Sequence, residues 1–347
     1  MQEATIEDVA KLSGVSIATV SRTFKHPELV AEKTRKKIKS VAKDLDFSIS
    51  RSAMILQAGK TYRIALLFNE RPSTWFNAHI YEGLNAVLQP AGYDITLQRI
   101  VSSDDRHKFF ETLPIRRNVD AVIVASINIS ENDSARLHSM KVPIVGINAV
   151  PEDAFNLSIR IDDRQSMRLA TQHLISIGHR NIAFIAYQYG QEDIGTLNFT
   201  TNFRIQGFKD ACEEAGIKPT IINVRRGENV IDNVLTSLFQ LQPTPTAICC
   251  QQDSLVVPLV PRLEQFGYRV PDDISIISVD DSDFAREMGL TEIRQDPTEM
   301  AQTIATRLLA MLEGQEVDVK HQILPTQIVF RNSTRPYRAA APAMQQR

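Results

Sequence analysis

The chain has 347 residues, of which 43% are apolar and 23% charged, and it carries a formal net charge of −2 at pH 7. These values are those of an ordinary globular protein, and the length predicts two or three domains with sizeable cores. No apolar run of the sequence approaches the roughly 20 residues that a transmembrane helix needs, so we do not expect a membrane-spanning chain.

The N-terminal stretch MQEATIEDVA lacks the basic and then apolar pattern of a signal peptide, and the three cysteines form no CxxC pair. We therefore expect a cytoplasmic protein in which the adjacent Cys249 and Cys250, which lie in an apolar run, are core thiols. No group of His, Cys or acidic residues has metal-ligand spacing, and the acidic run 280–283 lacks the glycine of an EF-hand loop. The sequence thus predicts no metal and no cofactor.

Charge is distributed unevenly along the chain. Residues 1–60 contain eleven Lys and Arg against seven Asp and Glu, a net charge of +4, and the remaining 287 residues carry −6. A basic head on a mildly acidic body suggests a polyanionic partner at one end only. Charge alone leaves one alternative open, a solvated basic helix.

Three helices are predicted in the head. Thr5 precedes apolar residues at i, i+3 and i+4 spacing and can cap a first helix, with Asp8 in the reciprocal position of a capping box. Gly14 can take the positive φ that ends this helix, and Ser16 is a natural N-cap for a second one. A third helix is expected from about Glu32 to Asp44. Two short helices joined by a tight turn predict a helix-turn-helix.

The second helix is expected to bury Val15, Thr19, Val20 and Phe24. Its other face contains Ser16, Ile17, Ala18, Ser21 and Arg22. In a helix-turn-helix the second helix enters the major groove of DNA. There Arg can donate to guanine O6 and N7 together, while Ser and Thr hydroxyls hold phosphates. The pattern therefore predicts binding to double-stranded DNA.

Two segments of the head, ATIEDVAKLSGVSIATVSRTF (4–24) and TRKKIKSVAKDLDF (34–47), resemble the headpiece of the LacI/GalR (lactose-repressor) family of bacterial transcription regulators. The resemblance implies base contacts by Ile17, Ala18 and Arg22, and phosphate contacts by Thr5, Ser16, Ser21 and Thr34. The chain departs from the family at Ala31, where a Ser usually caps the third helix. Loss of that cap is expected to cost about 1 kcal/mol.

The segment SRSAMILQAGK (50–60) resembles the family's hinge, in which a short helix forms on DNA and a Leu enters the minor groove. Leu56 occupies that position, and an apolar side chain there can kink a base step. Met54 stands where the family often has Arg. The alternative is that Leu56 belongs to the apolar stripe of a plain linker.

From Tyr62 onward, short apolar strands alternate with helical patterns in two successive sets. The strand segments are RIALLFN, DITLQRI, DAVIVAS, VPIVGIN and SIRID, then NIAFIAY, TIINV, TAICCQ and ISIISVD. A long helix is expected from about 202 to 214. Continuous β-branched runs between helices predict parallel sheets covered on both faces, hence an α/β fold of two doubly wound lobes. In such sheets ligands bind at the carboxyl ends of the strands.

This region is similar to the effector domain of the same family, which shares the fold of periplasmic sugar-binding proteins. The resemblance implies a headpiece at 1–48, a hinge at 49–60, a two-lobed effector-binding and dimerisation domain at 61–333, and a flexible tail at 334–347. It further implies an N-lobe of 61–161 and 292–323 and a C-lobe of 162–291 and 324–333.

Candidate effector-binding residues lie at strand ends or just after them. They are Asn69, Trp75, Phe76, Ser126 and Asn148 in the N-lobe and Arg204, Gln252 and Asp280 in the C-lobe. Carboxylates and Arg can bind pairs of sugar hydroxyls, and an aromatic ring can cover the apolar face of a sugar. The resemblance implies effector contacts by the residues at positions 148, 204, 252 and 280, although Gln replaces the usual Asn at 252.

Several of these candidates also have a purely structural interpretation. Trp75 is the only tryptophan, and a lone aromatic residue is commonly part of a core. Asp280 and Asp281 could cap the loop after a strand, and Asp253 could cap its own helix.

The sequence favours a transcription regulator, expected to be a repressor that binds a pseudo-palindromic operator as a homodimer and responds to a sugar or sugar derivative. The tail contains no apolar heptad that could form a tetramer. Two alternatives stay open: a regulator that responds to a phosphorylated carrier protein, and a sugar-binding receptor without DNA function. An enzyme is not expected, because the GxSxG, P-loop, GxGxxG and HExxH motifs are absent.

Overall fold

The computed structural model describes residues 4–25, 27–47, 60–68, 70–100, 105, 108–109, 111–112, 118–127, 129, 131–139, 142–188 and 198–338. The chain divides into two compact units, Met1–Thr61 and Tyr62–Arg347. Leu56, the predicted hinge wedge, and Asn69, a predicted effector contact, lie outside the described residues.

The first unit contains α1 (Ile6–Ser13), α2 (Ile17–Lys25), a 3-10 turn (Pro27–Leu29) and α3 (Glu32–Asp44). Thr5 Oγ1 accepts the N–H of Asp8 at 3.3 Å, and Asp8 Oδ2 accepts the N–H of Thr5 at 2.9 Å. Gly14 ends α1 at φ 66°. At the start of α2, Ser16 Oγ accepts the N–H of Thr19 at 3.2 Å. The predicted capping box, turn and second cap are confirmed.

A small apolar core holds these helices together. Its buried members are Val9, Ala10, Val20, Ile38 and Ala42. Phe24 and Phe47 close one side of it edge to face, with ring centroids 6.2 Å apart. No side chain caps α3 at Ala31, as predicted from the missing Ser.

The second unit is built on two six-stranded sheets, counted over its described residues. In spatial order the first contains β2 (Asp94–Arg99), β1 (Arg63–Phe68), β3 (Ala121–Ala125), β4 (Ile144–Ile147), β5 (Leu157–Ile161) and β11 (His321–Leu324). The second contains β7 (Thr220–Arg225), β6 (Ile182–Gln188), β8 (Ala247–Cys250), β9 (Ser275–Asp280), β10 (Thr291–Arg294) and β12 (Gln327–Val329). The paired strands run parallel, except that β12 runs antiparallel to β10.

Both sheets share one strand order. In each, the first strand lies between the second and the third, so that the order reverses at β1 and β3 in one sheet and at β6 and β8 in the other. A reversal of this kind is the switch point of a doubly wound sheet, where loops at the carboxyl ends diverge and leave a crevice. The predicted fold is confirmed. We call the part built on the first sheet the N-lobe and the part built on the second sheet the C-lobe.

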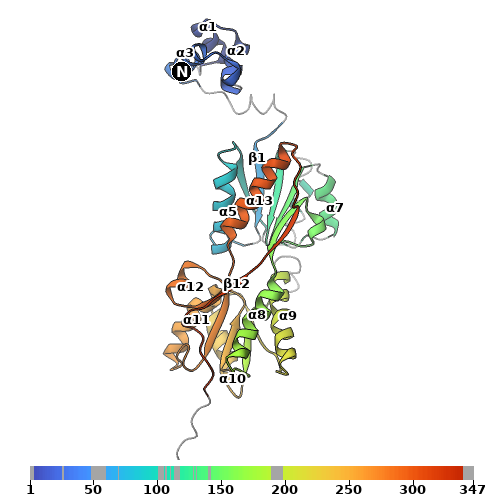
Figure 1. Cartoon of the computed structure of the whole chain (residues 1–347), viewed down its shortest axis with the longest axis vertical. Helices are drawn as coiled ribbons and strands as arrows, with labels where there is room; N and C mark the ends of the chain where they lie inside the picture. Colours follow the sequence, from blue (N-terminus) through green and yellow to red (C-terminus); the bar gives the residue numbers. More distant parts are fainter. Residues whose placement is uncertain are drawn as a thin grey trace, which may run out of the picture. The chain divides into compact units, whose positions relative to one another are not determined.

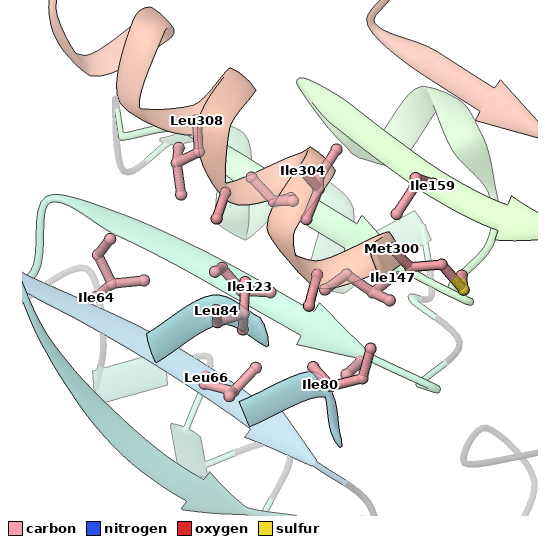
Figure 2. Packing of buried hydrophobic residues seen from close by; sticks show 14 of the residues in the cluster. Ile64, Leu66, Ile80, Leu84, Ile123, Ile147, Ile159, Met300, Ile304 and Leu308 are labelled. Carbon is pink, nitrogen blue, oxygen red and sulfur yellow. The ribbon is translucent and has the colours of Figure 1, made fainter. Parts of the chain in front are cut away.

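Helices cover both faces of the sheets. In the N-lobe, α5 (Trp75–Leu88) and α13 (Pro297–Leu312) lie side by side over one face (Figure 1). Figure 2 shows Leu84 from α5 and Ile304 and Leu308 from α13 among the side chains of the strands beneath them. At Gly83 a side chain would overlap the carbonyl oxygen of Thr298, so that glycine permits the close approach of the two helices.

In the C-lobe, α8 (Asp163–Ser176) and α9 (Asn198–Glu214) cover one face of the sheet. The helices α10 (Val230–Gln240) and α11 (Asp253–Gln265) cover the other. Three shorter elements flank the lobes, namely α7 (Glu131–Ser139), a 3-10 turn (Glu152–Ala154) and α12 (Asp283–Glu287). α9 begins four residues before its predicted start.

The chain passes between the two sheets three times, after β5, after β10 and after β11. Two predicted boundaries are wrong by a few residues. Glu292 pairs with Ser278 of β9, so residues 292–294 belong to the C-lobe sheet. Leu324 pairs with Ile161 of β5 and belongs to the N-lobe. The strand β10, with the sequence TEIR, was not predicted because a buried Glu and an exposed Arg interrupt its apolar pattern.

The predicted flexible tail is also wrong over its first residues, 334–338, which pack on the C-lobe. The N–H of Arg335 donates to Ser275 Oγ at 3.1 Å, and the N–H of Tyr337 donates to the carbonyl of Ile177 at 2.9 Å. The Tyr337 ring also lies 5.7 Å from that of His179. Paired backbone groups tie this segment to the lobe. Residues 339–347 lie outside the described part of the chain.

Candidate functional site

The predicted DNA-contact residues lie on the surface of the first unit. Thr5, Ser16, Ile17, Ala18 and Arg22 are exposed, and Ser21 and Thr34 are half-buried. On the opposite face of α2, Val20 is fully buried. The predicted division of this helix into an inward and an outward face is confirmed. The outward face combines hydroxyls, one guanidinium and the apolar surface of Ile17, which suits the polar and methyl-bearing edges of a major groove.

The third helix adds positive charge to the same unit. Its lysines at 33, 36, 37, 39 and 43 are all exposed, and only a Glu at 32 and an Asp at 44 oppose them within the helix. Lys36 pairs with Glu32 at 2.7 Å. Exposed lysines at this density favour a polyanionic partner through non-specific attraction.

In the second unit, residues of both lobes meet in one cleft with a cavity volume of about 200 Å³. From the N-lobe it is lined by Thr74, Trp75, Phe76, Ser126 and Asn148, and from the C-lobe by Thr200, Arg204, Gln252, Asp253, Ser254 and Asp280, together with Gln295. Seven of the eight predicted effector residues are therefore brought together. The eighth, Asn69, lies outside the described residues.

Three of the lining residues have backbone angles that non-glycine residues rarely adopt. Ser126 follows β3 at φ 56°, Asn148 follows β4 at φ 44°, and Asp280 ends β9 at φ 128°. Such conformations cost about 1–3 kcal/mol each and persist where the surrounding structure fixes them, commonly at binding sites. Each turns the chain sharply at the carboxyl end of a strand, so that the side chain lines the cleft.

Arg204 lies in the second turn of α9 and not at its start, because the helix begins at Asn198. Its Nε donates to Asp163 Oδ1 at 2.7 Å, and its Nη1 donates to the carbonyl of Gln251. Both charged side chains are buried. Burial raises the pKa of Asp163, and the Arg204 charge opposes that rise. The guanidinium is thus held in a fixed position at the wall of the cleft.

Two carboxyl groups lie together at the C-lobe side. Burial, and then the charge of Asp253, raises the pKa of Asp280 well above the usual aspartate range. Burial likewise raises the pKa of Asp253, whose Oδ2 is buried and accepts no hydrogen bond. Asp253 is the first residue of α11 and follows the N-cap, so the interpretation that it simply caps its helix does not account for this oxygen. The pair tends to share a proton, because two adjacent buried charges repel.

Gln295 joins the lobes at the floor of the cleft. Its Nε2 donates to Asp280 Oδ1, and its Oε1 accepts from Asn148 Nδ2 at 3.5 Å. Gln295 was not among the predicted residues because β10 was not predicted, although Gln295 also follows the carboxyl end of a strand. Thr74, Thr200 and Ser254 were also missed.

Trp75 begins α5 and is half-buried, so the interpretation that it is a core residue fails. Its Nε1–H is buried and donates to no acceptor. The ring lies 5.0 Å from that of His79, one helical turn later. An indole with an unused donor at the wall of a polar cleft can both stack on a ligand and donate to it.

Over the described part of the chain, no three His, Cys, Asp or Glu side chains are placed to hold a metal ion. None of its helices there has the length and apolar character needed to cross a membrane. The three cysteines are buried and unpaired, which confirms the prediction for Cys249 and Cys250.

The chain resembles known proteins over both units. The profile described as bacterial regulatory proteins, lacI family, matches residues 5–50, and that of a periplasmic binding protein-like domain matches residues 171–334. The HTH-type transcriptional repressor PurR of Photobacterium profundum is 28% identical over 339 residues, which cover 96% of this chain and 99% of that protein.

Solved structures agree in fold. The lac repressor dimer bound to operator and the anti-inducer ONPF matches with a TM-score of 0.81 at 22% identity, covering 96% of this chain and 100% of that one. The transcriptional regulator CelR in complex with cellobiose matches with a TM-score of 0.67 at 25% identity, covering 95% and 99%.

A helix-turn-helix unit together with a two-lobed domain that encloses a polar cleft defines a DNA-binding regulator with a ligand-binding domain. The chain belongs to the lacI family of bacterial regulatory proteins, as its sequence motifs predicted, and is a DNA-binding transcription regulator and not an enzyme.

Proposed function

We propose that this protein is a repressor whose affinity for its operator is controlled by a sugar or sugar derivative bound between the two lobes. One observation carries the proposal. Seven residues, chosen from the sequence for their hydrogen-bonding and stacking chemistry, come from both lobes and line a single cleft. A ligand that contacts both lobes binds one of their relative arrangements better than another and so shifts the equilibrium between them.

The size and chemistry of the cleft support a small polyhydroxylated ligand. A volume of about 200 Å³ fits a small ligand such as a monosaccharide better than a large one. Asp280 and Asp253 offer acceptors, Arg204 and Trp75 offer donors, and the aromatic rings of the N-lobe offer an apolar face.

For DNA, we propose that Ile17, Ala18 and Arg22 contact bases, and that Thr5, Ser16, Ser21 and Thr34 contact phosphates. Leu56 is proposed as the minor-groove wedge of the hinge. One headpiece covers only a few base pairs, so useful affinity needs two half-sites and a homodimer on a pseudo-palindromic operator. A DNA-bound regulator with this role acts in the cytoplasm. Light scattering checks the dimer, and a stable tetramer contradicts it.

The fluorescence of Trp75 can be used to detect effector binding. Trp75 is its only tryptophan and lines the cleft, so its fluorescence is expected to change when a ligand enters. Sugars, amino sugars and sugar phosphates are titrated against the full chain while emission is recorded. Any hit is retested by thermal unfolding, since a ligand at 100 times its Kd adds about 2.7 kcal/mol of stability.

The same hits are then tested for their effect on operator affinity, with Trp75→Phe as the matched variant that keeps an aromatic ring but loses the signal. A sugar that changes emission, unfolding and operator affinity supports the proposal. A protein that responds to no sugar but to a phosphorylated carrier protein contradicts it and favours that alternative. A hit that binds without any effect on DNA binding favours a receptor role.

A further inference from the structure

Two consecutive residues at the end of β9 adopt strained backbone conformations. Asp280 has φ 128° and Asp281 has φ 63°, and neither is a glycine. The first carries the carboxylate that lines the effector cleft. Since such angles persist only where neighbours fix them, some group must hold this turn in place.

Glu292 provides that support from the adjacent strand. It lies opposite Ser278 in the register of β9 and β10 and is 0% exposed. One of its carboxylate oxygens, Oε1, accepts the Ser278 hydroxyl, and the other, Oε2, accepts the N–H of Asp281 at 2.7 Å. The N–H of Asp281, which lies beyond the end of β9, therefore has a buried acceptor in Glu292.

Asp281 is held from its other side as well. Its Oδ2 accepts Arg294 Nε at 2.6 Å, and its Oδ1 accepts Arg331 Nη2 at 2.5 Å. The side chain of Asp281 is thus used to anchor the turn and not to line the cleft. The hydrogen bond from the N–H of Asp281 to Glu292 fixes the peptide group that joins Asp281 to Asp280. The two arginines neutralise Asp281 and not Glu292.

The charged groups around Glu292 are mostly acidic. Asp253 at the start of α11 and Asp281 at the end of β9 both disfavour its ionised form, and burial is the largest cause, so that the pKa of Glu292 is raised to about 8. Its charge in turn raises the pKa of Asp280 and of Cys250 on β8.

We propose that Glu292 is a positioning residue of the effector cleft, which holds the Asp280–Asp281 turn and whose negative charge, when present, opposes a charge on Asp280. Its importance for regulation rests on the proposed function of the cleft. The effect on the carboxyl pair does not, because it can be measured on the protein without any effector.

The test is a pH titration of Trp75 fluorescence in the full chain. Trp75 shares the cleft with Asp253 and Asp280, so its emission follows their charge. The transition that belongs to the pair is the one that Asp280→Asn abolishes. Glu292→Gln keeps the volume of the side chain, an acceptor for the N–H of Asp281 and a partner for Ser278, but it removes the charge.

In Glu292→Gln the transition that belongs to Asp280 is expected at a lower pH, because a neighbouring group that can carry a negative charge is gone. The matched control is Glu264→Gln, an exposed glutamate on α11 of the same lobe, which should leave the midpoint unchanged. Far-ultraviolet circular dichroism establishes that each variant is folded. An identical midpoint in Glu292→Gln and the parent overturns the proposal. The proposal is also overturned if the parent shows no pH transition in Trp75 fluorescence that disappears in Asp280→Asn.

Thermal unfolding against pH gives a second readout that a purely structural role does not move. The raised pKa of Glu292 means that the folded chain binds a proton that the unfolded chain releases. The parent therefore loses stability as the pH rises from the ordinary glutamate range to about 8. Glu292→Gln should show a smaller loss over that range, and a difference from the parent that is constant with pH contradicts the proposal.

Should Glu292→Gln fail to fold, Ser278→Ala replaces it. Removing the hydroxyl that donates to Glu292 disfavours its charge, so the midpoint of the pair should move in the same direction by a smaller amount. An unchanged or raised midpoint in this variant overturns the proposal. These outcomes do not depend on a ligand, so a cleft that binds no sugar refutes the proposed function alone.

Discussion

Gln295 donates a hydrogen bond to Asp280 across the floor of the cleft, from the segment that connects the two lobes. The same side chain accepts from Asn148 of the N-lobe. One amide thus contacts a polar residue of each lobe, and any movement of the lobes that separates them must break one of these bonds. We therefore expect Gln295 to link ligand binding to the arrangement of the lobes.

Gln295→Ala is expected to weaken effector binding about tenfold, roughly 1.4 kcal/mol, because Asp280 Oδ1 loses the donor and Asn148 Nδ2 loses the acceptor that Gln295 provides. Operator binding without effector should stay as in the parent. The affinity of the Trp75-detected ligand measures the first effect, and operator titrations measure the second. Gln302→Ala, on the exposed side of α13, is the control and should change neither. Equal ligand affinity in Gln295→Ala and the parent contradicts the linkage.

Arg22→Ala is expected to lower operator affinity by roughly 1–3 kcal/mol and to relax the preference at one base position in each half-site. Arg22 is exposed on the outward face of α2, where a guanidinium can reach a guanine edge. Lys33→Ala, on the exposed side of α3, should weaken all DNA sequences alike. Binding to a randomised operator library separates the two effects. If Arg22→Ala keeps the sequence preferences of the parent, the predicted base contact is wrong.

The sequence predicted most of the fold because its signals are local. Thr5, Gly14 and Ser16 each mark a helix end by the chemistry of its cap, and the apolar runs mark the strands. The strand 291–294 was not predicted, because Glu292 is a polar residue inside the core and its partner Ser278 is 14 positions away. Pairing across a sheet is not visible in one sequence without the structure.

The site residues also divide into those that local sequence signals predict and those that depend on contacts between distant parts of the chain. Asn148 and Asp280 could be predicted, because they end apolar strands and the carboxyl ends of parallel strands meet. The unpartnered oxygen of Asp253 and the bridge through Gln295 depend on how the lobes face each other. No local pattern encodes that relation. The packing of 334–338 was missed for a similar reason, since its backbone partners lie in distant parts of the chain.

Arg204→Ala is expected to destabilise the second unit by about 3–5 kcal/mol, because it leaves the buried Asp163 carboxylate without its counter-ion. Arg164→Ala is the matched control. Arg164 pairs with Asp210 between the same two helices, but that pair is exposed, so its loss should be hardly measurable. Urea unfolding of both variants tests this difference. Equal losses in the two variants rule out a special role for the buried pair.

Effector binding is expected to strengthen with rising pH. The pKa of Asp280 is raised by burial and then by Asp253, and an ionised carboxylate accepts more ligand hydroxyls than a protonated one. Binding therefore releases a proton, and affinity is lost as the pH falls through that raised pKa. Calorimetry in two buffers of different ionisation enthalpy measures the release. Proton uptake on binding, or no exchange at all, contradicts the assigned role of the pair.

The central claim, that a ligand in the cleft controls DNA binding, is tested most directly by operator affinity with and without the sugar that Trp75 detects. The variants are Asp280→Asn and Asn148→Asp, one in each lobe. Both exchange Asp and Asn, whose side chains have the same shape, so the backbone angles of these positions should be retained. In the parent, the sugar should change operator affinity by about 5- to 150-fold. In both variants that response should be lost while ligand-free operator binding is retained, and a full response in both would place the effector site elsewhere.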